Sequence, residues 1–112
     1  MIYKIFRGAE WDEARAADRF AGSPVDLQDG FIHFSTAAQA AETAARHFAG
    51  VSGLVLAEID PDRLGAPLIW EPSRGGALFP HLYGALPLSA VVRTWILPLD
   101  PDGRHRLPAG LR

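Results

Sequence analysis

The stretch Gly30-Phe31-Ile32-His33-Phe34-Ser35-Thr36 places one imidazole inside an apolar, strand-like segment that leads directly into a helix start. Strand alternation puts Phe31, His33 and Ser35 on one face and the residues between them on the other. A histidine at the end of a strand, followed by a helix N-terminus, is typical of a site for a polar or anionic ligand. The alternative is that His33 is a hydrogen-bonded structural residue.

The segment after this stretch predicts a helix from Thr36 to Phe48. Thr36 and Gln39 have the spacing of a capping box, and Gly50 is a suitable stop. The small side chains of its apolar stripe predict close packing on a sheet; they are Ala37, Ala40, Ala41 and Ala44, with Phe48.

The other predicted elements favour an α+β fold with a curved or split, mainly antiparallel sheet and two principal helices. We expect a second helix at Glu10–Phe20, ended by Gly22, and a turn at Asp26–Gly30. Strands are predicted at Ile2–Phe6, Phe31–Phe34, Leu54–Ile59, Pro67–Trp70 and Val91–Leu97. Single helical turns are expected at Asp60–Gly65 and Pro87–Ala90, a loop at Pro72–Leu86, a tight turn at Asp100–Gly103, and a closing strand or tail at Arg104–Leu107.

Length and composition narrow the classes of protein. At 112 residues we expect a single domain, 1–112, with a core at 1–97 and a turn and tail at 98–112. The net charge of −2 with scattered cations argues against a duplex nucleic-acid surface. The lack of cysteine excludes disulfides and thiolate chemistry. With no apolar run of about 20 residues and no signal peptide, we expect a cytoplasmic protein without a membrane segment.

A second motif runs from Trp70 to Gly76 and continues at Phe79–Gly84. It contains four chemically capable side chains among glycines and prolines, which indicates a shaped loop; they are Glu71, Arg74, His81 and Tyr83. Structural alternatives stay open. Glu71 caps a turn or pairs with Arg74, and the other two fill the loop core. Trp70 is expected in the core, His47 in a structural role at its helix end, and His105 in solvent.

These motifs resemble the bacterial domain-of-unknown-function 952 family over about residues 1–97. The matching pieces are Ile2-Tyr3-Lys4-Ile5, Trp11, Asp29–Ser35, Gln39, Thr43, His47-Phe48, Leu54-Val55-Leu56, Trp70-Glu71 and Leu78–Gly84. The family's fold is similar to that of the ADP-ribosyltransferase superfamily, a small α+β fold with a split sheet around an NAD cleft. The resemblance therefore implies NAD or a related nucleotide as ligand.

The resemblance also implies residue roles. His33 would contact a ribose hydroxyl, with Ser35 on the same side, and Tyr83 would stack against nicotinamide. Glu71 would stabilise the oxocarbenium-like transition state as nicotinamide leaves. Arg74 would pair with the pyrophosphate, and His81 would add a donor or general acid. The implied catalytic residues are thus Glu71, His33 and His81, and the implied binding residues are His33, Ser35, Arg74 and Tyr83.

One departure from the transferase pattern keeps other functions open. The transferase order is histidine, tyrosine, glutamate, whereas this chain has His33, Glu71, Tyr83 and no later glutamate. The alternatives are a non-enzymatic nucleotide or metabolite sensor and a module that binds a protein partner through Phe79–Tyr83. A metal set of His33, His81 and Glu71 lacks supporting local spacing, so no metal is expected.

Overall fold

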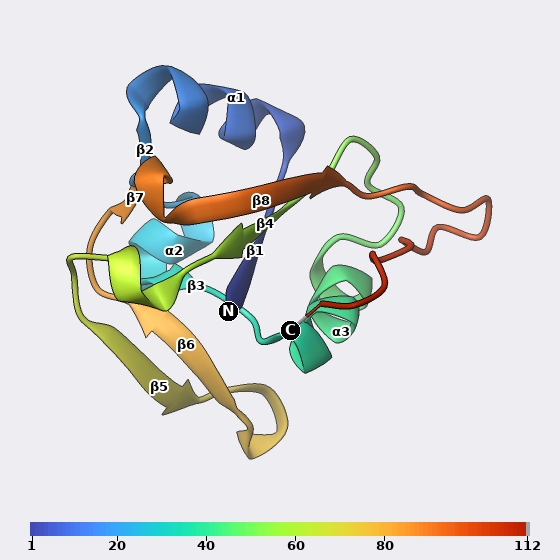
Figure 1. Ribbon diagram of the computed structural model, residues 1–112. Coiled ribbons are helices and arrows are strands. Elements are labelled where there is room, and N and C mark those ends of the chain that lie inside the picture. The colour runs from blue at the N-terminus through green and yellow to red at the C-terminus, as the bar shows by residue number, and fades with distance from the viewer. Residues whose placement is uncertain (112) are drawn as a thin grey trace.

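The computed structural model describes residues 1–111, with the backbone alone at Arg74. Within this part of the chain the strands form three antiparallel sheets, of order β1-β4-β8, β2-β7 and β3-β6-β5 (Figure 1). The strands are β1 (Ile2–Phe6), β2 (Arg19–Phe20), β3 (Ile32–His33), β4 (Val55–Ile59), β5 (Leu68–Pro72), β6 (Leu78–Leu82), β7 (Leu86–Pro87) and β8 (Val91–Ile96).

Three α-helices accompany the sheets among the described residues: α1 (Gly8–Ala17), α2 (Pro24–Asp29) and α3 (Ala37–His47). Figure 1 shows α1 and α3 well apart, with β1, β4 and β8 between them. The side chain of Thr36 caps α3 by accepting from the backbone N–H of Gln39, as the capping-box pattern predicts. Single 3₁₀ turns lie at Pro61–Arg63, Arg74–Gly76 and Leu88–Ala90.

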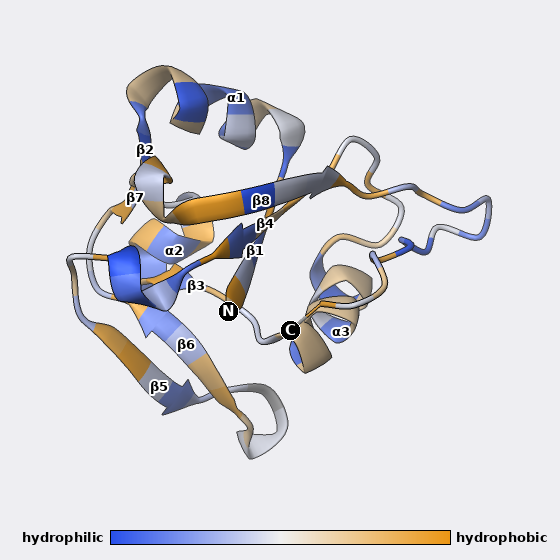
Figure 2. Cartoon of the chain, viewed as in Figure 1, coloured by the Kyte–Doolittle hydropathy of each residue, from blue (hydrophilic) through white to orange (hydrophobic). Residues whose placement is uncertain are grey.

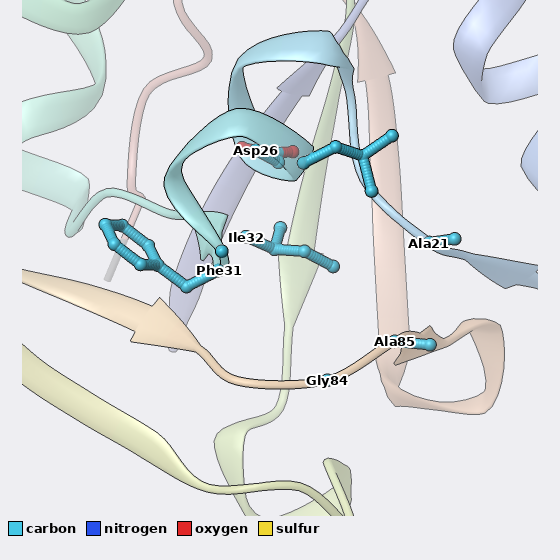
Figure 3. A pocket seen from close by; sticks show the side chains of 8 residues that line it. Ala21, Asp26, Phe31, Ile32, Gly84 and Ala85 are labelled. Atoms are coloured by element: carbon cyan, nitrogen blue, oxygen red, sulfur yellow. The ribbon is translucent and has the colours of Figure 1, made fainter.

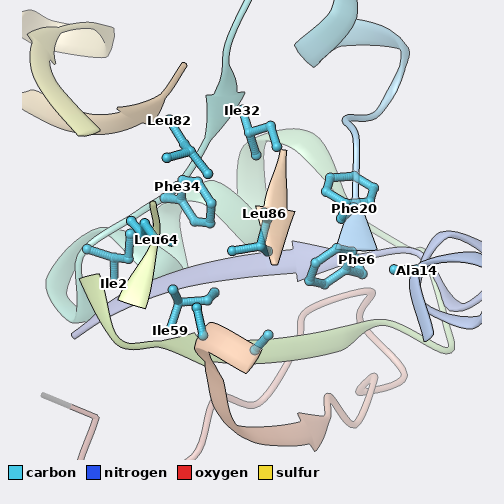
Figure 4. Close-up of a cluster of buried hydrophobic side chains, with 12 residues drawn as sticks. Ile2, Phe6, Ala14, Phe20, Ile32, Phe34, Ile59, Leu64, Leu82 and Leu86 are labelled. Atoms are coloured by element: carbon cyan, nitrogen blue, oxygen red, sulfur yellow. The ribbon is translucent and has the colours of Figure 1, made fainter. Parts of the chain in front are cut away.

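The β1-β4-β8 sheet is covered on both faces, and for this reason every residue of β1 is buried. Alternate side chains of β1 and β4 enter two different clusters. One contains Ile2, Phe6 and Ala14 of α1, and Figure 4 shows it between the sheets. The other packs Tyr3 and Ile5 against α3 and the C-terminal tail. In Figure 2, β5 and β8 carry both hydrophobic and hydrophilic residues, and α1 and α3 combine pale orange and blue segments.

The stretch Gly30–Thr36 joins two of the sheets. Its strand β3 pairs with β6, with His33 opposite His81. Two residues later, Ser35 and Tyr3 exchange backbone hydrogen bonds of 2.8 Å with each other, which ties the edge of β1 to the same segment. Both sheets are therefore positioned by the motif that also carries His33.

The α+β class and the antiparallel sheets agree with the prediction, and the two predicted principal helices are present as α1 and α3, but a third, shorter helix was not predicted. Residues 24–29, predicted to form part of a turn, make the third helix, which begins at the Ser23 cap and ends at Gly30 in the left-handed conformation. The first helix is also shorter than predicted. It ends at Asp18, φ 57°, rather than at Gly22, because aspartate tolerates this conformation and Arg19 then begins β2.

The predicted loop Pro72–Leu86 contains β6, the central strand of its sheet. Pro80 misled the prediction, since proline lacks the N–H that a central strand uses. β3 ends at His33, so Pro80 lies just beyond the part of β6 that pairs with β3. The carbonyl of Pro80 accepts a hydrogen bond from the N–H of Phe34 at 3.1 Å. The tail after β8 makes one isolated bridge, Leu99 to His105, instead of a closing strand.

Candidate functional site

The register of the β3-β6-β5 sheet brings the two sequence motifs together on one face. His33 lies directly opposite His81, so the two side chains share a face. Glu71 lies opposite Phe79, two residues from His81, and therefore reaches the same face from β5. Phe31 and Tyr83 complete a group of five side chains that we call the imidazole cluster: Phe31, His33, Glu71, His81 and Tyr83.

Phe31 contacts the three other rings of this cluster. Its ring stacks on His81 with centroids 4.0 Å apart and contacts His33 at 4.7 Å and Tyr83 at 5.3 Å. The two imidazoles meet edge to face at 5.4 Å. The His81 side chain is 5% exposed and that of His33 34%, so the first is structural support and the second faces solvent.

Glu71 is the hydrogen-bond acceptor of the imidazole cluster. Its Oε1 accepts from the Tyr83 hydroxyl at 2.7 Å and lies 2.8 Å from Nδ1 of His81. These hydrogen bonds, first from Tyr83 and then from His81, lower the pKa of Glu71. The same bond raises the pKa of Tyr83, because ionising the phenol would remove its proton from beside a carboxylate. Glu71 is therefore an ionised carboxylate on an exposed rim.

Asp26, a buried residue of α2, lies beneath His33, and we call it the hub because it contacts several groups at once. Its carboxylate accepts the backbone N–H groups of Ser23 and His33 at 2.9 and 3.1 Å, and the ammonium of Lys4 at 3.1 Å. Its Oδ1 also lies 2.6 Å from Nδ1 of His33. Lys4 in turn donates to the carbonyl of His33 at 2.9 Å. Both the ring and the backbone of His33 are thus fixed from inside the protein.

The charges of this hub compensate each other. Burial acts to raise the pKa of Asp26, but the hydrogen bond from His33 and the charge of Lys4 outweigh it and hold that pKa well below the usual range. Burial lowers the pKa of Lys4, and Asp26 opposes this effect. A charge this deeply buried is tolerated only when it is paired, so Lys4 and Asp26 depend on each other.

The outer nitrogen of His33 faces a second carboxylate. Nε2 lies 2.9 Å from Oδ2 of Asp29, the last residue of α2, whose side chain is 41% exposed. Each nitrogen of the His33 ring thus faces a carboxylate oxygen, Nδ1 that of the buried Asp26 and Nε2 that of the half-exposed Asp29.

A hollow of about 310 Å³ lies between α2 and the turn after β6, and it adjoins the imidazole cluster at Phe31. Its lining is mostly apolar and includes Leu27, Ile32 and Ala85 (Figure 3). Figure 3 shows the Phe31 side chain directed away from Gly84 and Ala85. Of the imidazole cluster, only Phe31 lines this hollow, and Asp26 borders it from α2.

Two of the predicted site residues are not brought into the cluster. Ser35, expected on the same side as His33, is buried, and its hydroxyl lies 2.9 Å from that of Thr43 on α3. The strand ends at His33, and the chain at Ser35 turns toward β1 and α3. Arg74 lies in the turn between β5 and β6, and its side chain is outside the described residues.

Other expectations for individual residues also change. Glu71 contacts His81 and Tyr83 instead of capping a turn. Trp70 is 46% exposed on the outer strand of its sheet, not in the core. His105, expected in solvent, lies 2.6 Å from the carbonyl of Val51 through Nε2. Among the described residues, no group of three His, Asp or Glu side chains is placed to hold a metal ion, and no helix is long and apolar enough to cross a membrane.

Sequence reasoning missed four residues that shape the site: Lys4, Asp26, Asp29 and Phe31. The signal for Phe31 was available, since it alternates with His33 along the strand. The two aspartates read as turn formers, because the short helix α2 was not predicted. Lys4 sits in an apolar strand, where a lone buried cation indicates a buried acid partner.

Comparisons with known proteins place the chain in a family. Protein CC0527 from Caulobacter crescentus, a Northeast Structural Genomics Consortium target, has a crystal structure that is 55% identical, with a TM-score of 0.89, over 94% of this chain and 92% of that chain. Its solution NMR structure is 56% identical, with a TM-score of 0.81, over 92% and 89%. A search of curated proteins finds no match. The profile of the family described as "Protein of unknown function (DUF952)" matches residues 5–94, and the chain therefore belongs to the DUF952 family.

Proposed function

We propose that the imidazole cluster binds NAD or a related nucleotide and that the protein is an ADP-ribosyltransferase-like enzyme of the cytoplasm. The observation that carries this proposal is that Glu71 Oε1 bonds both Tyr83 and His81 on the sheet face that also bears His33. In the chain these residues stand in an order unlike that of the transferases. In space the histidine, the tyrosine and the glutamate nevertheless form one group.

The chemistry of these side chains fits a ribose next to an aromatic base. Glu71 is an acceptor whose Oε1 is bound by Tyr83 and His81, and in this proposal its second oxygen, Oε2, accepts a hydrogen bond from a ribose hydroxyl. Tyr83 is 40% exposed and offers a ring face for a planar base. Lys4 is neutralised by Asp26, so the proposal gives the phosphates to Nε2 of His33 and, as the family resemblance implies, to Arg74.

In this proposal, the bond between nicotinamide and the ribose of NAD breaks and water attacks the same ribose carbon, which gives ADP-ribose, nicotinamide and a proton. In a transfer reaction, the nucleophilic group of an acceptor takes the place of water. Glu71 stabilises the positive charge that develops on the ribose as nicotinamide leaves, because a fixed carboxylate beside that charge needs no reorganisation. His81 positions Glu71 through the 2.8 Å contact, and its own ring is held by the stack on Phe31. His33 orients the ligand from its outer nitrogen.

The release of nicotinamide from NAD tests the enzymatic part of the proposal. Wild type incubated with NAD should release nicotinamide, measured by chromatography, and Glu71→Gln should abolish the release while the fold is kept. Glu42→Gln removes the same charge from an exposed pair with Arg46 on α3 and should release nicotinamide like wild type. Equal release by Glu71→Gln and wild type would exclude the catalytic role. NAD binding without release by wild type would favour the sensor.

A second candidate is a partner-binding module, favoured by the exposed apolar side chains of the β5-β6 hairpin. Ile69, Trp70 and Leu78 are 44%, 46% and 51% exposed. In the expected contact segment, Phe79–Tyr83, the side chains of Phe79 and Leu82 are buried in the core, so they offer no surface to a partner. Self-association would show as a concentration-dependent mass in solution that Trp70→Ser abolishes. A constant monomer mass for both proteins would remove this form of the candidate.

A further inference from the structure

The outer nitrogen of His33, Nε2, which the proposed function directs at the ligand, is held in one position by its neighbours. The ring cannot turn away from solvent, because Asp26 holds Nδ1 at 2.6 Å and its carboxylate is 1% exposed. Phe31 packs against the ring at 4.7 Å. Nε2 is consequently directed outward with one fixed geometry.

That position already holds an oxyanion. Oδ2 of Asp29 lies 2.9 Å from Nε2, the distance of a charge-assisted hydrogen bond. The carboxylate shows that a negatively charged oxygen fits at this point of the surface, both sterically and electrostatically.

Asp29 differs from Asp26 in how firmly it is bound. Asp26 is buried and has partners on Lys4, Ser23 and His33, whereas the side chain of Asp29 is 41% exposed. The Asp29 carboxylate contacts the His33 ring from the surface, so rotation of its side chain into water breaks this contact and leaves the buried Asp26 in place.

We propose that Nε2 of His33 is a binding point for an anionic oxygen of a ligand, and that Asp29 occupies it in the ligand-free protein as an intramolecular competitor. The ligand oxygen belongs to a phosphate or a carboxylate group. Displacement of Asp29 frees Nε2 for the ligand oxygen, while Asp26 keeps Nδ1 and Lys4 in place. In the nucleotide proposal, which this inference deepens but does not require, a phosphate oxygen takes this place.

The test is binding of inorganic phosphate and of acetate to wild type and to Asp29→Ala, at one pH and one ionic strength. The dissociation constant is measured from NMR shifts, with the ring signals of His33 as the local reporter. Removing the competitor should tighten binding of at least one of the two anions roughly tenfold, the effect of freeing one charge-assisted contact. The anion that gains more identifies the kind of ligand group.

Two control variants separate the contact from a general charge effect. Asp12→Ala removes the same charge from an exposed residue of α1 and should leave both affinities at the wild-type value. Asp29→Asn removes the charge but keeps an acceptor for Nε2, and should give a smaller gain. Equal affinities for wild type and Asp29→Ala, an equal gain in Asp12→Ala, or a gain without movement of the His33 signals would each overturn the proposal.

The outcome is separable from that of the proposed function. A phosphate gain in Asp29→Ala, combined with no NAD binding by either protein, supports the anion point and rejects the nucleotide role. NAD binding by both proteins without any gain for phosphate or acetate supports the nucleotide role and rejects the anion point.

Discussion

Oδ1 of Asp26 lies 2.6 Å from Nδ1 of His33, and this contact links the buried interior to the exposed cluster. The carboxylate is inaccessible, whereas the ring is 34% exposed. A buried acid thus fixes the orientation of a solvent-facing imidazole, as carboxylates behind functional histidines do in other proteins. The stability of α2 and the geometry of His33 therefore rest on the same side chain.

Removing the Asp26 carboxylate should be strongly destabilising. Asp26→Ala leaves the buried ammonium of Lys4 without its partner, which costs about 3–5 kcal/mol in free energy of unfolding. Denaturant unfolding measures this loss. Asp29→Ala, which breaks an exposed contact, should stay within about 1 kcal/mol of wild type. Equal losses in the two variants would contradict the assignment of Asp26 as the hub.

Acid should weaken the fold through the same residue. Because the pKa of Asp26 is lowered on folding, the unfolded chain binds the additional proton as the pH falls below about 4, and stability is lost with it. The free energy of unfolding, measured against pH, should decline below this value. Lys4→Met/Asp26→Leu replaces the pair with apolar side chains, and its decline should be shallower. Identical slopes would show that other carboxylates cause the decline.

Glu71 should control the ionisation of Tyr83. Because Glu71 raises the pKa of Tyr83, Glu71→Gln should shift the ionisation of this phenol to lower pH. The chain has two tyrosines, so ultraviolet absorbance against pH resolves the change, and Tyr83→Phe identifies which step belongs to Tyr83. An unchanged titration in Glu71→Gln would mean that the 2.7 Å bond is not formed in solution.

Gly84 should be needed for packing. A methyl group at this position would lie 2.7 Å from Cβ of Ala66, which is closer than carbon atoms approach. Gly84→Ala should therefore destabilise by about 1–3 kcal/mol in denaturant unfolding. Ala66→Gly removes the opposing atom and should restore most of the loss in the double variant. Additive losses in the double variant would show that the contact with Ala66 is not the cause.

Local signals predicted much of the fold. The capping box at Thr36, the alternation in β1 and the apolar run of β4 were read correctly because each depends on neighbouring residues alone. β6 was missed because its pairing with β3 and β5, distant in the chain, outweighs the preference of Pro80 against a central strand. Helix α2 was missed for a related reason, since six residues are too few for a periodic pattern.

The sequence identified chemically capable side chains but did not show whether their two motifs meet. His33, Glu71, His81 and Tyr83 lie together because β6 pairs with both β3 and β5. Their partners depend on tertiary structure: Lys4 reaches Asp26 across 22 positions of sequence. Ser35 failed as a cluster residue because alternation holds only while the strand continues, and β3 ends two residues before it.

The most direct test of the nucleotide proposal is thermal unfolding with NAD and with ADP-ribose, each at about 1 mM. A ligand at 100 times its dissociation constant stabilises by roughly 2.7 kcal/mol, which raises the midpoint of a domain this size by several degrees. The account predicts such a rise for wild type, and none for His33→Ala measured against its own ligand-free midpoint. No rise in wild type, or an equal rise in both proteins, would contradict it.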